Sequence, residues 1–305
     1  MITISTSHLH APFRHARIFA AGIVALCLLA GFAPGPARGY ESDIHQKLTF
    51  VAAKQLNRCV AGSGVPGVNA LQVRLIAKAN TRQADANLFV RMFRWNYYDR
   101  SGVGDRDILW VIDTRFHEHF DEVVRRIGAA DQANDRYREL GRVVGYVQDV
   151  TSPSHAVPVY ATRWWRLTLK DRFDRYPVDE EAVSGLVEGS CEAAMNPAAD
   201  FHTVLEEAAQ DTLAAVQQPV TGLPVTWEIF WQAHEDPGRF GSYGPAGNNF
   251  GRGARFPCGQ SERCVLLDDD PLYADFAVRR HAAAVVASVR AMMIAQRIQQ
   301  EVSGE

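Results

Sequence analysis

The feature that most constrains this chain is an apolar period of about 3.6 residues, typical of amphipathic helices, that recurs along most of its length. In the last long segment, 273–299, one face carries Val278, Ala282, Val285, Val289 and Met292. The same period predicts helices over 43–57, 71–78, 85–97, 109–127, 132–149, 180–194 and 198–216. No alternating run of convincing strand length accompanies them. We therefore expect an all-α fold, built as a single multi-helix domain.

One segment, at about 235–264, departs from this period. It is rich in glycine and proline, with aromatic residues Phe240, Tyr243, Phe250 and Phe256 between them. Such a composition predicts a long irregular loop, and loops of this length are usually functional or disordered. The aromatic residues favour packing against the rest of the domain.

The N-terminus has the pattern of an export signal. Arg14 and Arg17 precede an apolar run over 18–30, which is shorter than the roughly 20 residues that a membrane-spanning helix needs. The small residues in Ala37-Arg38-Gly39 predict cleavage before Tyr40. Residues 1–39 are thus expected to be a signal peptide and 40–305 a secreted or periplasmic domain with no stable membrane span. A retained membrane anchor is the alternative.

Cleavage would leave a mildly acidic protein with four cysteines. The formal net charge is −3, and it falls to −6 when 1–39 are removed, since that segment holds three arginines and no acids. Such a protein has no general attraction for nucleic acid or anionic lipid. Cys258 and Cys264 are close enough to close a small loop, which leaves Cys59 to pair with Cys191. A cysteine metal site is the alternative, but no Cys-x-x-Cys pair is present.

The segment 140–160 carries the most informative chemistry. Its helical part directs valines toward the core and places Asp149 near the end of the helix, where Pro153 prevents simple continuation. His155 follows six residues after Asp149. A carboxylate and an imidazole at such a turn can approach one cavity, and both are ligands that zinc accepts.

This segment resembles the zinc-dependent phospholipase C and nuclease P-one superfamily. That family has a histidine, three residues, an aspartate and, six positions later, a histidine in a Pro-x-His setting. Here Asp149, Pro153 and His155 match, whereas Gly145 stands in place of the first histidine.

The resemblance extends to the predicted new N-terminus. Family members bind zinc through the α-amino group and carbonyl of an N-terminal tryptophan and through a histidine five residues later. Tyr40 and His45 have that spacing. An α-amino group has a pKa of roughly 7.7–8, so a metal can displace its proton easily. Export processing would then create the site.

Further positions follow from the same resemblance. Asp85 corresponds to a metal-binding aspartate that is sometimes proposed as the general base, and it is our candidate catalytic residue. Asn96 and Lys170 stand where the family has histidines, and Asp174 keeps an acidic ligand. The retained metal ligands implied are Tyr40, His45, Asp85, Asp149, His155 and Asp174. Lys170 and Asn96 become candidate substrate-binding residues.

The replacements are unevenly spread over the three zinc sites that the resemblance implies. The set formed by Tyr40, His45 and Asp149 is complete, so we expect one tight zinc site. The second site loses both histidines, and the third has a cation, Lys170, in place of its middle ligand. Lys170 could bind a phosphate oxygen or simply be a solvated lysine. Likewise, Asp85 and His155 could be helix caps.

The remaining histidines are expected to have structural roles. His117 and His119 are two residues apart, a spacing that directs side chains away from each other on a helix. His202 and His234 are isolated. His281 lies beside Arg279 and Arg280, which predicts a solvated helix face.

Together these observations predict an exported zinc-dependent hydrolase of phosphate ester bonds with a reduced metal site. Its substrate would be a small-molecule or lipid phosphate ester, or single-stranded nucleic acid. The alternative is a catalytically inactive exported binding or scaffold module that keeps the fold and at most one structural zinc. A third possibility is a plain helical exported protein whose motif matches arise by chance. Oligomeric state is not predicted.

Overall fold

The computed structural model describes residues 40–84, 97–101, 116–159, 171–195, 200–260 and 262–304. The predicted signal peptide, 1–39, and most of the predicted helix 85–97 lie outside these residues, as do Asp85, Asn96 and Lys170. The described residues belong to one compact unit, Pro36–Glu305.

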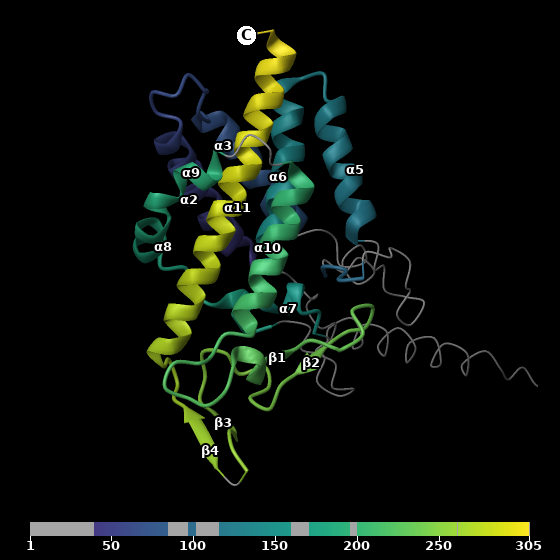
Figure 1. The fold of residues 1–305 in the computed structure, drawn as a ribbon. Helices are drawn as coiled ribbons and strands as arrows, with labels where there is room; N and C mark the ends of the chain where they lie inside the picture. Colours follow the sequence, from purple (N-terminus) through teal and green to yellow (C-terminus); the bar gives the residue numbers. More distant parts are fainter. Residues whose placement is uncertain are drawn as a thin grey trace, which may run out of the picture. The chain divides into compact units, whose positions relative to one another are not determined.

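The longest element is α11, Pro271–Ser303, against which most of the other helices pack. It begins where the Asp270 carboxylate accepts a hydrogen bond from the Leu272 backbone, followed by Pro271 at the first helical position. It ends at Gly304, whose φ of 67° is left-handed. Figure 1 shows α11 in yellow, passing beside α6 and α10.

The other helices pack on α11 or on one another. α2 (Ser42–Cys59) packs on α3 (Ala70–Ala84) and α11, and α6 (Ala133–Asp149) packs on α3, α5 (Phe116–Ala129) and α11. α10 (Phe201–Val216) packs on α11 and on the short α7 (Pro153–Ala156). The remaining short helices are η1 (Phe173–Arg175), α8 (Glu180–Val187), η2 (Glu188–Ser190), α9 (Cys191–Ala194) and η3 (Trp227–Ile229).

α6 is the helix that brings the central motif into the core. Val143, Val144 and Val147 are fully buried, as the sequence predicted. Gly141 allows close packing on α3, because a Cβ at that position would lie 2.3 Å from the carbonyl oxygen of Ile76. Helix α6 therefore ends, at Asp149, deep inside the protein.

The described chain is mostly helical, with two short antiparallel hairpins in the region expected to be an irregular loop. β1 (Trp231–Gln232) pairs with β2 (Ser242–Tyr243), and β3 (Ala254–Pro257) pairs with β4 (Arg263–Leu266). The mostly helical structure fits the expected all-α class, but the hairpins were not predicted, because strands of two to four residues are too short for a reliable period. In Figure 1 both hairpins lie at the end where α11 begins.

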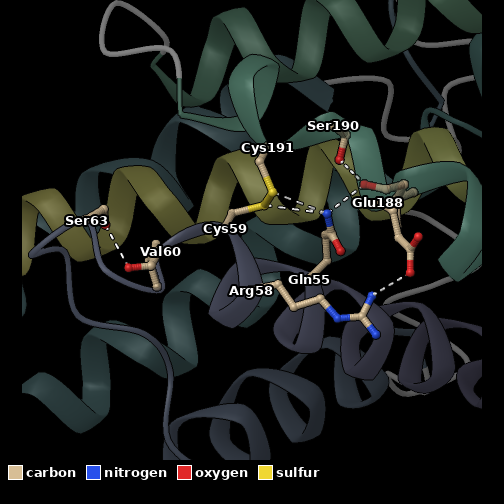
Figure 2. Close-up of a disulfide and its surroundings, with 9 residues drawn as sticks. Gln55, Arg58, Cys59, Val60, Ser63, Glu188, Ser190 and Cys191 are labelled. Carbon is tan, nitrogen blue, oxygen red and sulfur yellow. Dashed lines mark hydrogen bonds and ion pairs between the residues drawn. A yellow bond between two sulfur atoms is a disulfide. The ribbon is translucent and has the colours of Figure 1, made fainter.

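Both predicted disulfides are present. Cys59, at the end of α2, is bonded to Cys191, at the start of α9, and Cys258 is bonded to Cys264 beside β3 and β4. Figure 2 shows Gln55 beneath the first bridge, where its amide donates to the carbonyl of Val187 at 2.6 Å. No helix in the described part of the chain is long and apolar enough to cross a membrane.

Candidate functional site

Five of the residues predicted as metal ligands are described, and all five are buried. Tyr40 precedes α2 and His45 lies near its start. Asp149 is the last residue of α6, His155 lies in α7 and Asp174 in η1. Each has at most a few per cent of its surface exposed. The first turn of α2, the end of α6 and the loop at 171–176 thus meet in the interior.

Tyr40 is fixed in this cluster at both ends. Its hydroxyl lies 3.3 Å from Oγ1 of Thr151, which itself donates to the carbonyl of Gln148. Burial raises the pKa of Tyr40, so the phenol stays neutral and can donate. The backbone N–H of Glu41, the next residue, donates to the carbonyl of Asp174 at 3.0 Å. The Tyr40 ring packs edge-on against His45, with centroids 5.9 Å apart.

His45 and Asp149 form the closest pair of predicted ligands. His45 Nε2 lies 3.2 Å from Asp149 Oδ1. His45 Nδ1 lies 2.6 Å from Oε1 of Gln148, an atom that can only accept. His45 therefore carries hydrogen on Nδ1, and its Nε2 faces the carboxylate.

The orientation of Gln148 is fixed by a buried network of amides and hydroxyls. Its Oε1 also accepts from Nδ2 of Asn80 at 2.8 Å. Its Nε2 donates to Thr49 Oγ1 at 3.3 Å and to Ser288 Oγ at 3.1 Å. These partners come from α2, α3 and α11, so three helices determine which nitrogen of His45 bears the proton.

The contact between His45 and Asp149 has a definite chemical requirement. A neutral imidazole with hydrogen on Nδ1 presents a lone pair at Nε2, and a carboxylate oxygen is also an acceptor. Two acceptors 3.2 Å apart, with side chains at most 4% exposed, repel each other unless a proton or a metal cation lies between them. The pair could therefore share either a proton or a metal cation.

His155 and Asp174 form a second, looser pair. His155 Nε2 lies 3.6 Å from Asp174 Oδ2, and Ser152 donates to Asp174 Oδ1 at 2.6 Å. The ring of Tyr97 stacks on His155 with centroids 5.1 Å apart. This packing positions the imidazole of His155 beside the carboxylate of Asp174.

Gly145 occupies the position where the resemblance places a histidine, and amides fill the adjacent space. A Cβ at Gly145 would lie 2.9 Å from Oδ1 of Asn80 and 3.4 Å from Nε2 of Gln83. Both of these amide atoms are buried without a hydrogen-bond partner. Any side chain at 145 would therefore require the side chain of Asn80 to move.

Asp171 is a buried acid that the sequence analysis did not single out. Its Oδ2 accepts from Trp231 Nε1 at 2.9 Å and Tyr243 Oη at 2.8 Å, and its Oδ1 accepts from the Phe173 backbone. Burial, followed by the nearby Asp174 carboxylate, raises the pKa of Asp171 to about 6. Asp171 thus fastens the paired strands β1 and β2 to the loop that holds Asp174.

The prediction of a solvated His281 was wrong. This residue is 0% exposed and its ring packs against Tyr40 and Phe173, with centroids 5.5 and 5.8 Å away. Neither ring nitrogen has a hydrogen-bond partner. Burial lowers the pKa of His281 to about 3, so the ring is neutral. The error arose because α11 is enclosed on several sides, and its neighbour Arg280 is itself buried against Asp211.

Three of the other described histidines have local partners. His117 Nε2 lies 3.0 Å from the carbonyl oxygen of Asp99, and His202 pairs with Asp121 at 2.8 Å. His234 Nδ1 accepts from the Asp236 backbone. None of these contacts brings two histidines to one point.

Within the described residues, no three His, Cys, Asp or Glu side chains are arranged to hold a metal ion. The first predicted set, however, needs only two side chains, because Tyr40 would contribute its amine and carbonyl after cleavage. Ligand atoms about 2.1 Å from a tetrahedral zinc lie about 3.4 Å from one another. The 3.2 Å between His45 Nε2 and Asp149 Oδ1 fits that spacing.

Comparison with protein-family models, with curated proteins and with solved structures found no match for this chain. The inference about function therefore rests on the residues and their geometry.

Proposed function

We propose that the chain, once residues 1–39 are removed, is an exported phosphoesterase-like hydrolase of the zinc-dependent phospholipase C and nuclease P-one type. It would hold one zinc ion through the α-amino group and carbonyl of Tyr40, through His45 and through Asp149. The observation that carries this proposal is the buried contact of His45 Nε2 with Asp149 Oδ1, two acceptor atoms at a distance that a shared proton or a shared zinc ion would satisfy.

The protein's own groups would have separate roles. Gln148 keeps the proton of His45 on Nδ1, so that Nε2 is free to act as a ligand. Ser152 orients Asp174, which lies beside His155 at the predicted remnant of a further site. Asp85 would orient or deprotonate the attacking water, and Lys170 and Asn96 would contact the phosphate. Zinc bound there would polarise a phosphoryl oxygen and lower the pKa of a bound water.

The substrate would be a lipid or small-molecule phosphate ester in preference to single-stranded nucleic acid. The mature chain would carry a net charge of −6, and binding to a nucleic-acid backbone depends on clustered cations that release counterions. A single phosphate needs only a local contact.

A second candidate function is an exported binding module without catalytic activity. The amides around Gly145 favour it, since Asn80 and Gln83 occupy the space where the resemblance has a zinc-binding histidine. Phosphodiester hydrolysis with several metals clamps both the attacking and the leaving oxygen. A single cation would hold the N-terminus without supplying that clamp.

Zinc content and turnover, measured on the same preparation, test both candidates. Protein beginning at Tyr40 is dialysed against zinc, the bound metal is counted by mass spectrometry, and hydrolysis of bis-p-nitrophenyl phosphate is followed. One zinc per chain with turnover supports the hydrolase, and one zinc without turnover supports the binding module. Protein that retains no zinc contradicts both.

The variant Asp149→Asn identifies the ligand set. It keeps the size of the side chain but removes the charge, so zinc should be lost. The matched control is Asp171→Asn, which changes another buried carboxylate that belongs to no proposed ligand set and should leave the zinc count unchanged.

A further inference from the structure

A groove of about 760 Å³ lies between α2 and α3, and it plays no part in the proposed zinc site. Its floor consists of the small buried side chains of Ala53, Val68 and Ala77. The two helices pack directly on each other. Because these lining side chains are short, a hollow remains between the two helices at the surface. Volumes of roughly 300–1,000 Å³ are typical of small-molecule sites.

The rim of the groove is strongly basic. Lys54 on α2 and Arg74 and Lys78 on α3 line it, and no described carboxylate forms an ion pair with any of the three. Helix α3 contains no acidic residue, and Glu180 is the only acid among the described residues that line the groove. Like charges spaced four residues apart on a helix destabilise it slightly. A bound anion would relieve this repulsion.

The groove also has an apolar side, which an inorganic anion would not use. Phe50 is 38% exposed at its edge, and Val73 is half-buried. Phe50 is the only aromatic residue among the described residues that line the groove, whereas proteins that bind single-stranded nucleic acid stack successive bases on several aromatic rings. The lining therefore fits a ligand with one anionic head and an aliphatic chain.

We propose that the groove between α2 and α3 binds the anion of a long-chain fatty acid. The carboxylate contacts Lys54, Arg74 and Lys78, and the hydrocarbon chain lies along Phe50, Val73 and the alanine floor. This inference is independent of the proposed zinc site.

Calorimetric titration of the chain beginning at Tyr40 with dodecanoate, below its micelle concentration, tests the proposal. Two comparison ligands separate the contributions: hexanoate keeps the head and shortens the chain, and dodecyltrimethylammonium keeps the chain and reverses the charge. We expect dodecanoate to bind at least about tenfold more tightly than hexanoate, as the buried methylene groups require. Dodecyltrimethylammonium should not bind measurably.

Matched charge variants locate the site. The double variant Arg74→Gln/Lys78→Gln should weaken dodecanoate binding about tenfold or more, since it removes two charge-assisted contacts. The control is Arg82→Gln, one turn further along α3 and outside the groove lining, for which we expect less than about a twofold change. Glutamine preserves helix propensity, and circular dichroism verifies that each variant is folded.

Several results would overturn the proposal. Equal binding of hexanoate and dodecanoate would mean that the apolar side is unused. If Arg82→Gln weakened dodecanoate binding as much as the double variant does, the loss of affinity would reflect the overall charge of the protein and not contacts in the groove. Groove-dependent binding of a 12-nucleotide single strand that displaces dodecanoate would assign the groove to nucleic acid instead.

Discussion

At the scale of single residues, Gln148 determines the chemistry available to His45. Its carbonyl oxygen accepts from His45 Nδ1, and this fixes the nitrogen that faces Asp149. Partners that orient a metal-binding histidine are typically worth 10- to 100-fold, roughly, in metal affinity. The proposed zinc site should therefore depend on a residue that touches no metal.

We predict that Gln148→Leu lowers zinc affinity by about 10- to 100-fold, because the His45 ring loses the acceptor that holds its tautomer. Competition with a fluorescent chelator measures the affinity. The control Ser288→Ala removes a hydroxyl that accepts a hydrogen bond from Gln148 Nε2 and does not contact His45. It should change the zinc affinity by less than about threefold. Unchanged zinc binding in Gln148→Leu would exclude the proposed role of the glutamine.

His281 gives a second prediction at this scale. Its pKa is lowered to about 3 in the folded chain from an ordinary 6.5, so the unfolded chain binds more protons between these values. Stability associated with the neutral ring is therefore present above pH 6.5 and is lost as the pH falls toward 3. His281→Leu removes this proton uptake and also removes two buried ring nitrogens without partners.

We expect His281→Leu to be more stable than the wild type by about 1–2 kcal/mol at pH 7, with the difference growing by up to about 3 kcal/mol at pH 4. Urea unfolding at both pH values measures the two differences. A difference that does not change with pH would mean that His281 titrates normally in the folded protein.

At the scale of secondary-structure elements, the paired strands β1 and β2 are held by one carboxyl group. Asp171 accepts from Trp231 and Tyr243, residues that face each other across these strands. The pKa of Asp171 is raised to about 6, above its ordinary 3.8. The stability that this group contributes is therefore fully present below pH 3.8 and is lost as the pH rises through 6.

The loss of a donor to this carboxyl should matter most when it is ionised. We predict that Tyr243→Phe destabilises the protein by about 1.5–3 kcal/mol at pH 7.5 and by only about 1 kcal/mol at pH 4.5, because a bond to a charged acceptor is stronger. The control Tyr273→Phe removes a bond to the neutral carbonyl of Arg252, so its effect should be equal at both pH values. Equal effects at the two pH values for Tyr243→Phe would contradict the assignment.

The two disulfides close loops of very different length, with sequence separations of 132 and 6. In the chain-entropy account, the stabilisation increases with the length of the closed loop. We predict that Cys59→Ser/Cys191→Ser lowers the free energy of unfolding by about 3–5 kcal/mol, and Cys258→Ser/Cys264→Ser by about 2 kcal/mol. Urea unfolding of both variants provides the comparison, and the reverse order would contradict the prediction.

Elements with a long apolar period could be predicted, and short ones could not. The helix expected over 132–149 is observed as α6, Ala133–Asp149, because its buried residues Tyr137, Leu140, Val144 and Val147 recur every three or four positions. The hairpins were missed because their strands are only two to four residues long. His281 was expected on a solvated face because its neighbours in the sequence are arginines. Its burial depends on how other parts of the chain pack around α11, which the local sequence does not reveal.

The candidate site shows the same division. Tyr40, His45 and Asp149 could be selected because the sequence resembles a family with ligands at these positions, and they lie close together. Asn80 and Gln148 could not be selected from the sequence, because an asparagine or glutamine in a buried network looks the same in a sequence as one on a solvated face. Only the meeting of α2, α3 and α6 reveals their role.

At the scale of the whole molecule, the proposed zinc site requires a free amine at Tyr40, and residues 39 and 40 are joined by a peptide bond in the uncleaved chain. The nitrogen of a peptide bond carries a hydrogen, and its lone pair is delocalised into the carbonyl group, so it does not bind zinc. The uncleaved chain should therefore lack the tight site even though His45 and Asp149 are present. A protein that begins at Gly39 differs from the processed one by a single glycine and provides a minimal control.

We predict that zinc at 100 times its dissociation constant stabilises the chain that begins at Tyr40 by about 2.7 kcal/mol and has little effect on the chain that begins at Gly39. Calorimetric unfolding with zinc, and again with chelator, measures both effects. The zinc-dependent gain should diminish below about pH 7, because the amine must lose a proton whose pKa is roughly 7.7–8. If the chain that begins at Gly39 gained as much, zinc would be held by side chains alone, and export processing would have no part in forming the site.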